Sequence, residues 1–81
     1  MESGVIERVS VTSSRIRGDK DRDRLESTIG TIDGVRDVSI DPERHTVEVA
    51  FDPTVVDRNA IKAAVEDAGY KVDSETSQVV T

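Results

Sequence analysis

The fold is decided by residues 35–53, which read VRDVSIDPERHTVEVAFDP. Large apolar residues recur at every second position at the end of 35–40 (Val38, Ile40) and through 47–51 (Val47, Val49, Phe51). Alternation with a period of two is typical of strands that bury one face. The segment between the two runs, Asp41-Pro42-Glu43-Arg44, is rich in turn-forming residues. The stretch therefore predicts a β-hairpin.

A helix is predicted on each side of this hairpin. Apolar residues in 19–32 recur at i, i+4 and i+7, and acidic residues fill the first turns, which predicts a helix that ends at Asp33-Gly34. Residues 57–69 show apolar positions at i, i+3, i+4 and i+7. In that second helix, Asp57 is placed to accept hydrogen bonds from the first free amides, and the helix is expected to end at Gly69.

Strands are expected at both ends of the chain. Residues 5–11 are rich in β-branched side chains, and Tyr70 and Val72 begin a final short strand that Val79 and Val80 extend or leave as a tail. The order is then strand, helix, strand, strand, helix, strand. This order predicts an α+β class with a ferredoxin-like βαββαβ sandwich, in which a four-stranded antiparallel sheet carries two helices on one face.

Composition limits the class of protein. A chain of 81 residues without cysteine holds one modest core and excludes disulfides, thiolate metal sites and thiol catalysis. No apolar run approaches the roughly 18 residues of a membrane span, and the start lacks the pattern of a signal peptide. The net charge of −6 repels phosphate backbones. We therefore expect one domain over residues 1–81, with a core of about 6–73 and a C-terminal extension of 74–81, in a cytoplasmic protein that binds neither membrane nor nucleic acid.

Three segments of the chain share a pattern with a known family. They are Gly34-Val35 after the first helix, Val47 to Phe51 followed by Asp52-Pro53, and Ile61 to Val65 followed by Glu66-Asp67-Ala68-Gly69-Tyr70. With these spacings the chain resembles the heavy-metal-associated domain family of copper chaperones and copper-pump N-terminal modules over about residues 6–73. The resemblance implies the same ferredoxin-like fold.

The metal loop of that family is altered here. The family carries a Gly-Met-Thr-Cys-x-x-Cys motif before the first helix, and counting back from Gly34 places its methionine on Ile16 and its cysteines on Gly18 and Asp21. Glycine offers no side chain, and the carboxylate of Asp21 is a hard oxygen ligand unsuited to Cu(I). We therefore expect no metal site and no cofactor.

The charged segment 15–24 takes the place of the metal motif, with five basic and three acidic residues. It is read first as a solvated helix start, in which Asp19 and Asp23 pair with basic neighbours at i+3 or i+4. A second reading is a hard-metal site of Asp19, Asp21 and Asp23, although an EF-hand would also need a glycine at position 24 and a glutamate at position 30. The third is a loop that binds an anion or a partner through the helix amides and the two arginines. That candidate loop consists of Arg15, Arg17, Gly18, Asp19 and Asp21.

Few other residues suggest chemistry. His45 is expected to be exposed in the hairpin turn, with no second ligand nearby in the sequence. Tyr70 matches the tyrosine that closes over the family's metal loop, and is expected simply to pack there. Phe51 should face the helices, which leaves the open sheet face without the aromatic residues on which RNA-binding domains of this topology stack bases.

The predicted function is a small non-catalytic module in protein interaction or regulation, which binds a protein partner as a monomer or a weak homodimer. A metal-handling protein that binds metal weakly through Asp21 or His45, or that docks on a transporter, stays open as an alternative. So does an amino-acid-sensing regulatory domain of the same topology. No nucleophile with a base, and no pair of carboxylates at a cleft, indicates an enzyme.

The composition also predicts a response to salt. Eight arginines against three lysines, thirteen valines against one leucine and many aspartates resemble proteins of salt-loving archaea, although a GC-rich genome would give the same bias. Seventeen carboxylates and a net charge of −6 destabilise the compact state by repulsion.

We expect the melting temperature to rise between about 0.1 M and about 2 M sodium chloride, because the Debye length falls from about 10 Å at 0.1 M to about 3 Å at 1 M. Relief of about 1 kcal/mol corresponds to a rise of roughly 4 to 8 °C in a domain of this size. Thermal unfolding followed by circular dichroism measures it. A melting temperature that stays flat or falls would leave the acidic composition as a solubility feature only.

Overall fold

The computed structural model describes residues 5–80, with side chains placed for 5–77. Strands and helices follow one another in the predicted order, βαββαβ. The elements are β1 (Ile6–Thr12), α1 (Asp19–Gly30), β2 (Val35–Asp41), β3 (Thr46–Phe51), α2 (Arg58–Asp67) and β4 (Ser74–Val80). Within the described part of the chain, no helix is long and apolar enough to cross a membrane.

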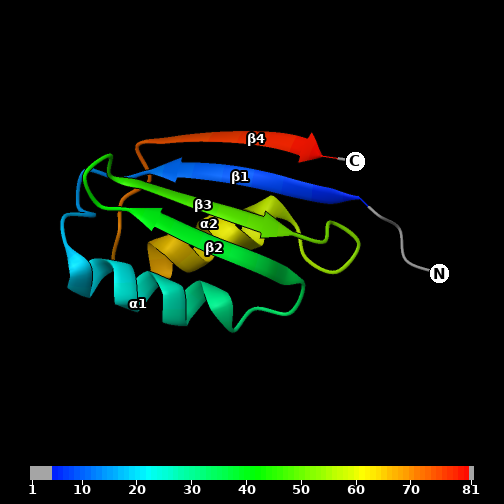
Figure 1. The fold of residues 1–81 in the computed structure, drawn as a ribbon, viewed down its shortest axis with the longest axis horizontal. Coiled ribbons are helices and arrows are strands. Elements are labelled where there is room, and N and C mark those ends of the chain that lie inside the picture. Colours follow the sequence, from blue (N-terminus) through cyan, green and yellow to red (C-terminus); the bar gives the residue numbers. More distant parts are fainter. Residues whose placement is uncertain (1–4, 81) are drawn as a thin grey trace.

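The four strands form one antiparallel sheet in the order β2-β3-β1-β4 (Figure 1). The two central strands, β1 and β3, pair from Glu7 with Phe51 to Thr12 with Thr46. The predicted hairpin is confirmed, with β2 and β3 in register except for a bulge between Val35 and Asp37. Both helices cover one face of this sheet, so the predicted ferredoxin-like sandwich is confirmed.

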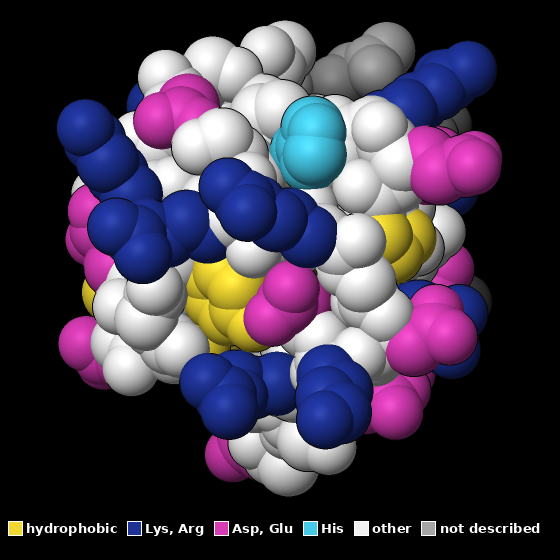
Figure 2. Space-filling model, turned by 90° about the vertical axis from the view of Figure 1, so that its left-hand side faces the viewer, with side chains coloured by type: hydrophobic (Ala, Val, Ile, Leu, Met, Phe, Trp, Pro, Cys, Tyr) yellow, Lys and Arg dark blue, Asp and Glu magenta, His cyan; other side chains and the backbone are white. Residues whose placement is uncertain are grey.

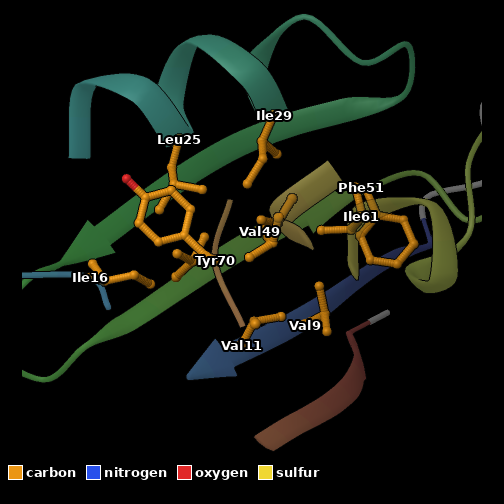
Figure 3. Packing of buried hydrophobic residues seen from close by; sticks show 11 residues of the cluster. Val9, Val11, Ile16, Leu25, Ile29, Val49, Phe51, Ile61 and Tyr70 are labelled. Atoms are coloured by element: carbon orange, nitrogen blue, oxygen red, sulfur yellow. The ribbon is translucent and has the colours of Figure 1, made fainter. Parts of the chain in front are cut away.

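The core lies between the helices and that face of the sheet (Figure 3). Alternate residues of the central strands are fully buried, and Phe51 lies beside Ile61 of α2, as expected for a residue facing the helices. Each such side chain contributes roughly 1.5 to 3 kcal/mol when it leaves water. The fully buried apolar side chains are Val9, Val11, Ile16, Leu25, Ile29, Val47, Val49, Phe51, Ile61 and Val65.

The helix ends follow the predicted signals, with one shift. The carboxylate of Asp57 accepts a hydrogen bond from the amide of Ala60 at 2.8 Å and caps α2, and Gly69 takes a positive φ of 100° just after it. Helix α1 ends at Gly30, before the predicted stop at Asp33-Gly34, because the amide of Ile32 bonds back to the carbonyl of Ile29 in a tighter turn.

The prediction that the last strand begins at Tyr70 is wrong. The amide of Tyr70 bonds to the carbonyl of Val65 in the turn that closes α2, and β4 begins only at Ser74. Its first four residues, Ser-Glu-Thr-Ser, lack apolar alternation because β4 is an edge strand. The segment that we expected to form a C-terminal extension therefore contains a strand paired with β1.

Gly34 connects α1 to β2 under two constraints. Its φ of 94° lies in the region that favours glycine, and its carbonyl accepts the amide of Asp52 at 2.8 Å. A Cβ built on Gly34 would lie 2.8 Å from Cβ of Val55 and 2.9 Å from Cγ1 of Val56. No larger residue fits this position without displacing the segment that leads into α2.

Replacing Gly34 with alanine should therefore lower the free energy of unfolding by about 2 to 4 kcal/mol, from backbone strain and overpacking together. The matched control is Gly30→Ala, where a Cβ meets no atom within 4 Å. Because glycine costs a helix about 0.5 to 1 kcal/mol relative to alanine, the control should be slightly stabilised. Urea unfolding of both variants measures the difference, and equal stabilities would contradict this account of the turn.

Candidate functional site

The loop of residues 13–18 joins β1 to α1 at one end of the sheet. Ser13 and Ile16 are fully buried, and the amide of Ile16 bonds to the carbonyl of Ser13 at 3.1 Å. The buried hydroxyl of Ser13 accepts the amide of Arg15 at 3.3 Å, so its polar atom has a partner. Ile16 thus anchors the loop in the core while its neighbours Arg15 and Arg17 stay exposed.

Asp21 connects the loop to Tyr70, which follows α2. Its carboxylate accepts the hydroxyl of Tyr70 at 2.5 Å and the amide of Arg17 at 3.0 Å. The bond from Tyr70, then that from Arg17, lowers the pKa of Asp21 below its ordinary 3.8, since both stabilise the charged form. Burial, followed by the bond to Asp21, raises the pKa of Tyr70 to about 12.

Sequence reasoning missed this bond between Tyr70 and Asp21. It placed Tyr70 over the loop, where the ring does pack beside Ile16 and Leu25 (Figure 3). A buried tyrosine hydroxyl needs a partner, and Asp21, where the family resemblance predicts the second cysteine, is the group that this ring would reach. The presence of Tyr70 together with Asp21 was the signal in the sequence from which this bond could have been predicted.

His45 supports the loop from the hairpin turn. The residue is exposed, as expected, and it has a positive φ of 56°. Its Nδ1 lies 2.6 Å from the carbonyl oxygen of Ile16, so this nitrogen carries the proton and donates. Its own carbonyl accepts the amide of Ser13 at 2.9 Å. The only histidine of the chain therefore stabilises the loop through hydrogen bonds, a role that the sequence did not suggest.

The donor atoms of this site do not fit a soft metal. The chain has no thiolate, Gly18 is the N-cap of α1 with no side chain, and both carboxylate oxygens of Asp21 already accept hydrogen bonds. The hard-metal interpretation finds no support in the geometry either. Within residues 5–80, no group of three or more His, Cys, Asp or Glu side chains is placed to hold a metal ion.

Basic side chains dominate the surface of this end (Figure 2). The figure shows Lys and Arg side chains around a hydrophobic patch, with an acidic side chain beside it and the histidine nearby. Arg22 lies 3.7 Å from Asp19 and 3.8 Å from Asp23, so the expected pairing holds at i+3 for Asp19, whereas Asp23 pairs with its direct neighbour. The cations of the segment for which the described structure shows no ion pair are Arg15, Arg17, Lys20 and Arg24.

Of the five residues in the candidate anion- or partner-binding loop, the structure brings four together. Arg17 and Asp21 are joined by the hydrogen bond above, and Gly18 lies between them as the helix cap. The guanidinium of Arg17 also donates to the carbonyl of Ser14 at 3.3 Å, and Arg15 lies across the same shallow hollow. Asp19 faces Arg22 instead.

Comparison with known proteins gives one family. The sequence profile of the heavy-metal-associated domain matches residues 11–71. The copper chaperone CopZ of Bacillus subtilis (strain 168) is 40% identical over 48 residues, which are 59% of this chain and 70% of that protein. A probable copper-exporting P-type ATPase of Archaeoglobus fulgidus is 33% identical over 55 residues, which are 68% of this chain but 7% of the ATPase. The chain thus spans only a small part of that relative.

A solved structure agrees with these sequence relatives. The putative copper-ion-binding protein from Bacillus anthracis str. Ames superposes with a TM-score of 0.78 at 29% identity, and the match covers 84% of this chain and 96% of that one. The similarity therefore extends over most of the βαββαβ unit.

The bond between Tyr70 and Asp21 predicts a pH dependence. Because the pKa of Asp21 is lowered by folding, its contribution to stability is complete above about pH 4 and is lost as the pH falls through the folded-state pKa. Tyr70→Phe keeps the ring and removes the bond, so it should lower the melting temperature by a few degrees at neutral pH, and the difference from the parent should narrow below pH 4.

A double-mutant cycle controls this experiment. In an Asp21→Asn background the carboxylate is absent, so the added Tyr70→Phe change should produce no difference that depends on pH. Thermal unfolding of the four proteins between about pH 2.5 and 7 provides the data. A difference between Tyr70→Phe and the parent that is constant over this range would show that the charged form of Asp21 does not hold Tyr70.

Proposed function

Since the chain belongs to the heavy-metal-associated domain family, we propose that it acts in heavy-metal handling as a docking module that carries no soft metal itself. One observation supports this most directly. At the position of the second family cysteine, Asp21 uses its carboxylate to hold Tyr70 and the amide of Arg17. The group that would bind the metal is replaced by one that closes the loop without it.

The loop keeps a defined shape by these contacts. Asp21 ties it to Tyr70, His45 ties it to the hairpin turn, and Ile16 anchors it in the core. Partner proteins recognise shape and charge, and a surface that is already ordered loses little entropy on binding. A loop of this kind keeps the ordered surface that docking needs, although it has no ligands for Cu(I).

The charge of the surface supports an acidic partner. Four cations around the loop have no ion pair in the described structure, although the whole chain carries a net charge of −6. A local basic surface on an acidic protein steers complementary partners into one orientation and repels basic ones. The partner we propose is an acidic domain of another heavy-metal-handling protein, such as a transporter or a chaperone, with no catalytic step on this chain.

Copper titration tests the loss of the metal site. The protein should form no one-to-one Cu(I) complex that survives competition from a strong Cu(I) chelator, since it offers only oxygen and imidazole ligands. The variant Gly18→Cys/Asp21→Cys should gain such a complex. Its two thiols lie three residues apart at the start of α1, where the helix dipole lowers thiol pKa.

The control carries the same spacing elsewhere. Ala63→Cys/Glu66→Cys places two exposed thiols three residues apart inside and at the end of α2. It should bind Cu(I) more weakly than the loop variant, because no loop arranges its ligands. Equal Cu(I) binding by the two variants would mean that the loop does not correspond to the metal-binding loop of the family. Tight Cu(I) binding by the parent protein would refute the proposal.

Docking is tested by charge reversal. In Arg15→Glu/Arg17→Glu, binding to the acidic metal-binding domains encoded in the same genome should weaken by about tenfold or more, because rim charges steer association. Arg8→Glu/Lys62→Glu makes the same change of net charge away from the loop and should bind as the parent does. Amide shifts of the labelled protein measure both, and an equal loss in the two variants would assign the effect to net charge alone.

A further inference from the structure

A groove runs along the edge of the sheet, away from the loop. β2 is an edge strand, and α1 packs along it (Figure 1). The groove between them is lined by Glu26 and Gly30 of α1 and by residues 35–38 of β2. It belongs to neither the basic loop surface nor the metal-motif positions.

Two valines of β2 form the apolar part of the groove. Val35 and Val38 are only partly buried, although both pack against the core. Gly30 is exposed in the last turn of α1, and a Cβ placed on it would meet no atom within 4 Å. Side chains of a neighbouring segment therefore have space to enter between the helix and the strand.

β2 also offers its backbone. An edge strand presents unpaired amide and carbonyl groups on its outer side, and these groups can pair with an added strand. The bulge between Val35 and Asp37 disturbs the start of β2, which leaves the regular part from Val38 to Asp41 for pairing. An extended segment that pairs there and continues past Val38 toward Val35 would send alternate side chains into the groove, which residues 35–38 line.

The charge beside the groove determines which kind of partner segment can bind there. Glu26 and Asp37 form no ion pair in the described structure, whereas Arg36 lies 3.8 Å from the carboxylate of Asp52 and is neutralised by it. Two unpaired carboxylates, Glu26 on the helix side of β2 and Asp37 on the open face of the sheet, outnumber the single arginine, so the charge beside this edge is negative. A segment with basic side chains complements it.

A second copy of this chain complements the edge poorly. Antiparallel pairing of two β2 strands centred on Ser39 would place Asp37 of one copy opposite Asp41 of the other, and like charges in directly opposite positions are destabilising. Two chains that each carry a net charge of −6 also repel one another.

We propose that the β2 edge and the α1 groove bind an extended basic segment of a partner protein. The segment adds as a fifth strand beside β2. Its small apolar side chains lie over Val38 next to Gly30 and Glu26, and its lysines or arginines lie on the opposite face of the sheet, near Asp37. The site is separate from the loop surface, so its test does not depend on the proposed function.

The probe is a blocked peptide of about ten residues in which lysine and valine alternate. Titrated at about 0.1 M salt into the labelled protein, it should shift the amides of residues 38–41 and of the last turn of α1. The same peptide with glutamate in place of lysine should bind at least about tenfold more weakly. A lysine and valine peptide with N-methyl groups on alternate residues cannot pair as a strand and should also lose binding.

Two variants, each with a matched control, locate the site. Gly30→Trp fills the groove and should weaken binding by about tenfold, whereas Gly30→Ala leaves the groove open and should bind as the parent does. Glu26→Lys/Asp37→Lys should reverse the preference between the basic and acidic peptides. Glu66→Lys/Asp67→Lys changes the net charge equally on exposed positions of α2 and should leave the preference as it is.

Several outcomes would overturn the proposal. Shifts confined to β4 or to the loop, equal binding of the acidic and N-methylated peptides, or parental affinity in both the Gly30→Trp and the Glu26→Lys/Asp37→Lys variants would each do so. A dimer in light scattering that Gly30→Trp or the charge reversal dissolves would assign the edge to a second copy instead. Thermal unfolding confirms that each variant is folded, and the peptide comparison on the parent protein decides the case without any variant.

Discussion

The hydrogen bond between Tyr70 and Asp21 fixes the end of the molecule on which its proposed docking role depends. Tyr70 follows α2 and Asp21 lies in the first turns of α1. The bond therefore connects the two helices at an end of the molecule where strand pairing does not connect them. A buried phenol without a partner is costly, and a carboxylate without one leaves the loop free to move. Each group satisfies the other, and Arg17 is held by the same carboxylate.

This arrangement explains how the fold tolerates the loss of its metal ligands. In a thiolate loop, the metal ion itself connects the residues that bind it. Here the same segment is fixed by hydrogen bonds from Tyr70 and His45 and by the burial of Ile16. The loop shape therefore rests on contacts within the chain itself.

The sequence predicted the elements whose signals are local. Alternating apolar residues specified the hairpin, and Asp57 and Gly69 specified the ends of α2, because these signals act within a few residues. β4 was placed four residues too early, since Ser74 begins an edge strand that carries polar side chains and is defined by pairing with β1. The bond between Tyr70 and Asp21 joins residues 49 positions apart, and no local pattern specifies such a contact.

The distribution of charge gives the small domain two different surfaces. The loop end collects cations for which the described structure shows no ion pair, and beside the edge strand β2 the carboxylates of Glu26 and Asp37 form none either. Exposed ion pairs contribute little to stability, so leaving these groups unpaired costs the fold little. Opposite charges at separate places on one rigid sandwich favour partners of opposite character. Under the two proposals above, these surfaces would let one domain connect two proteins without a bound metal.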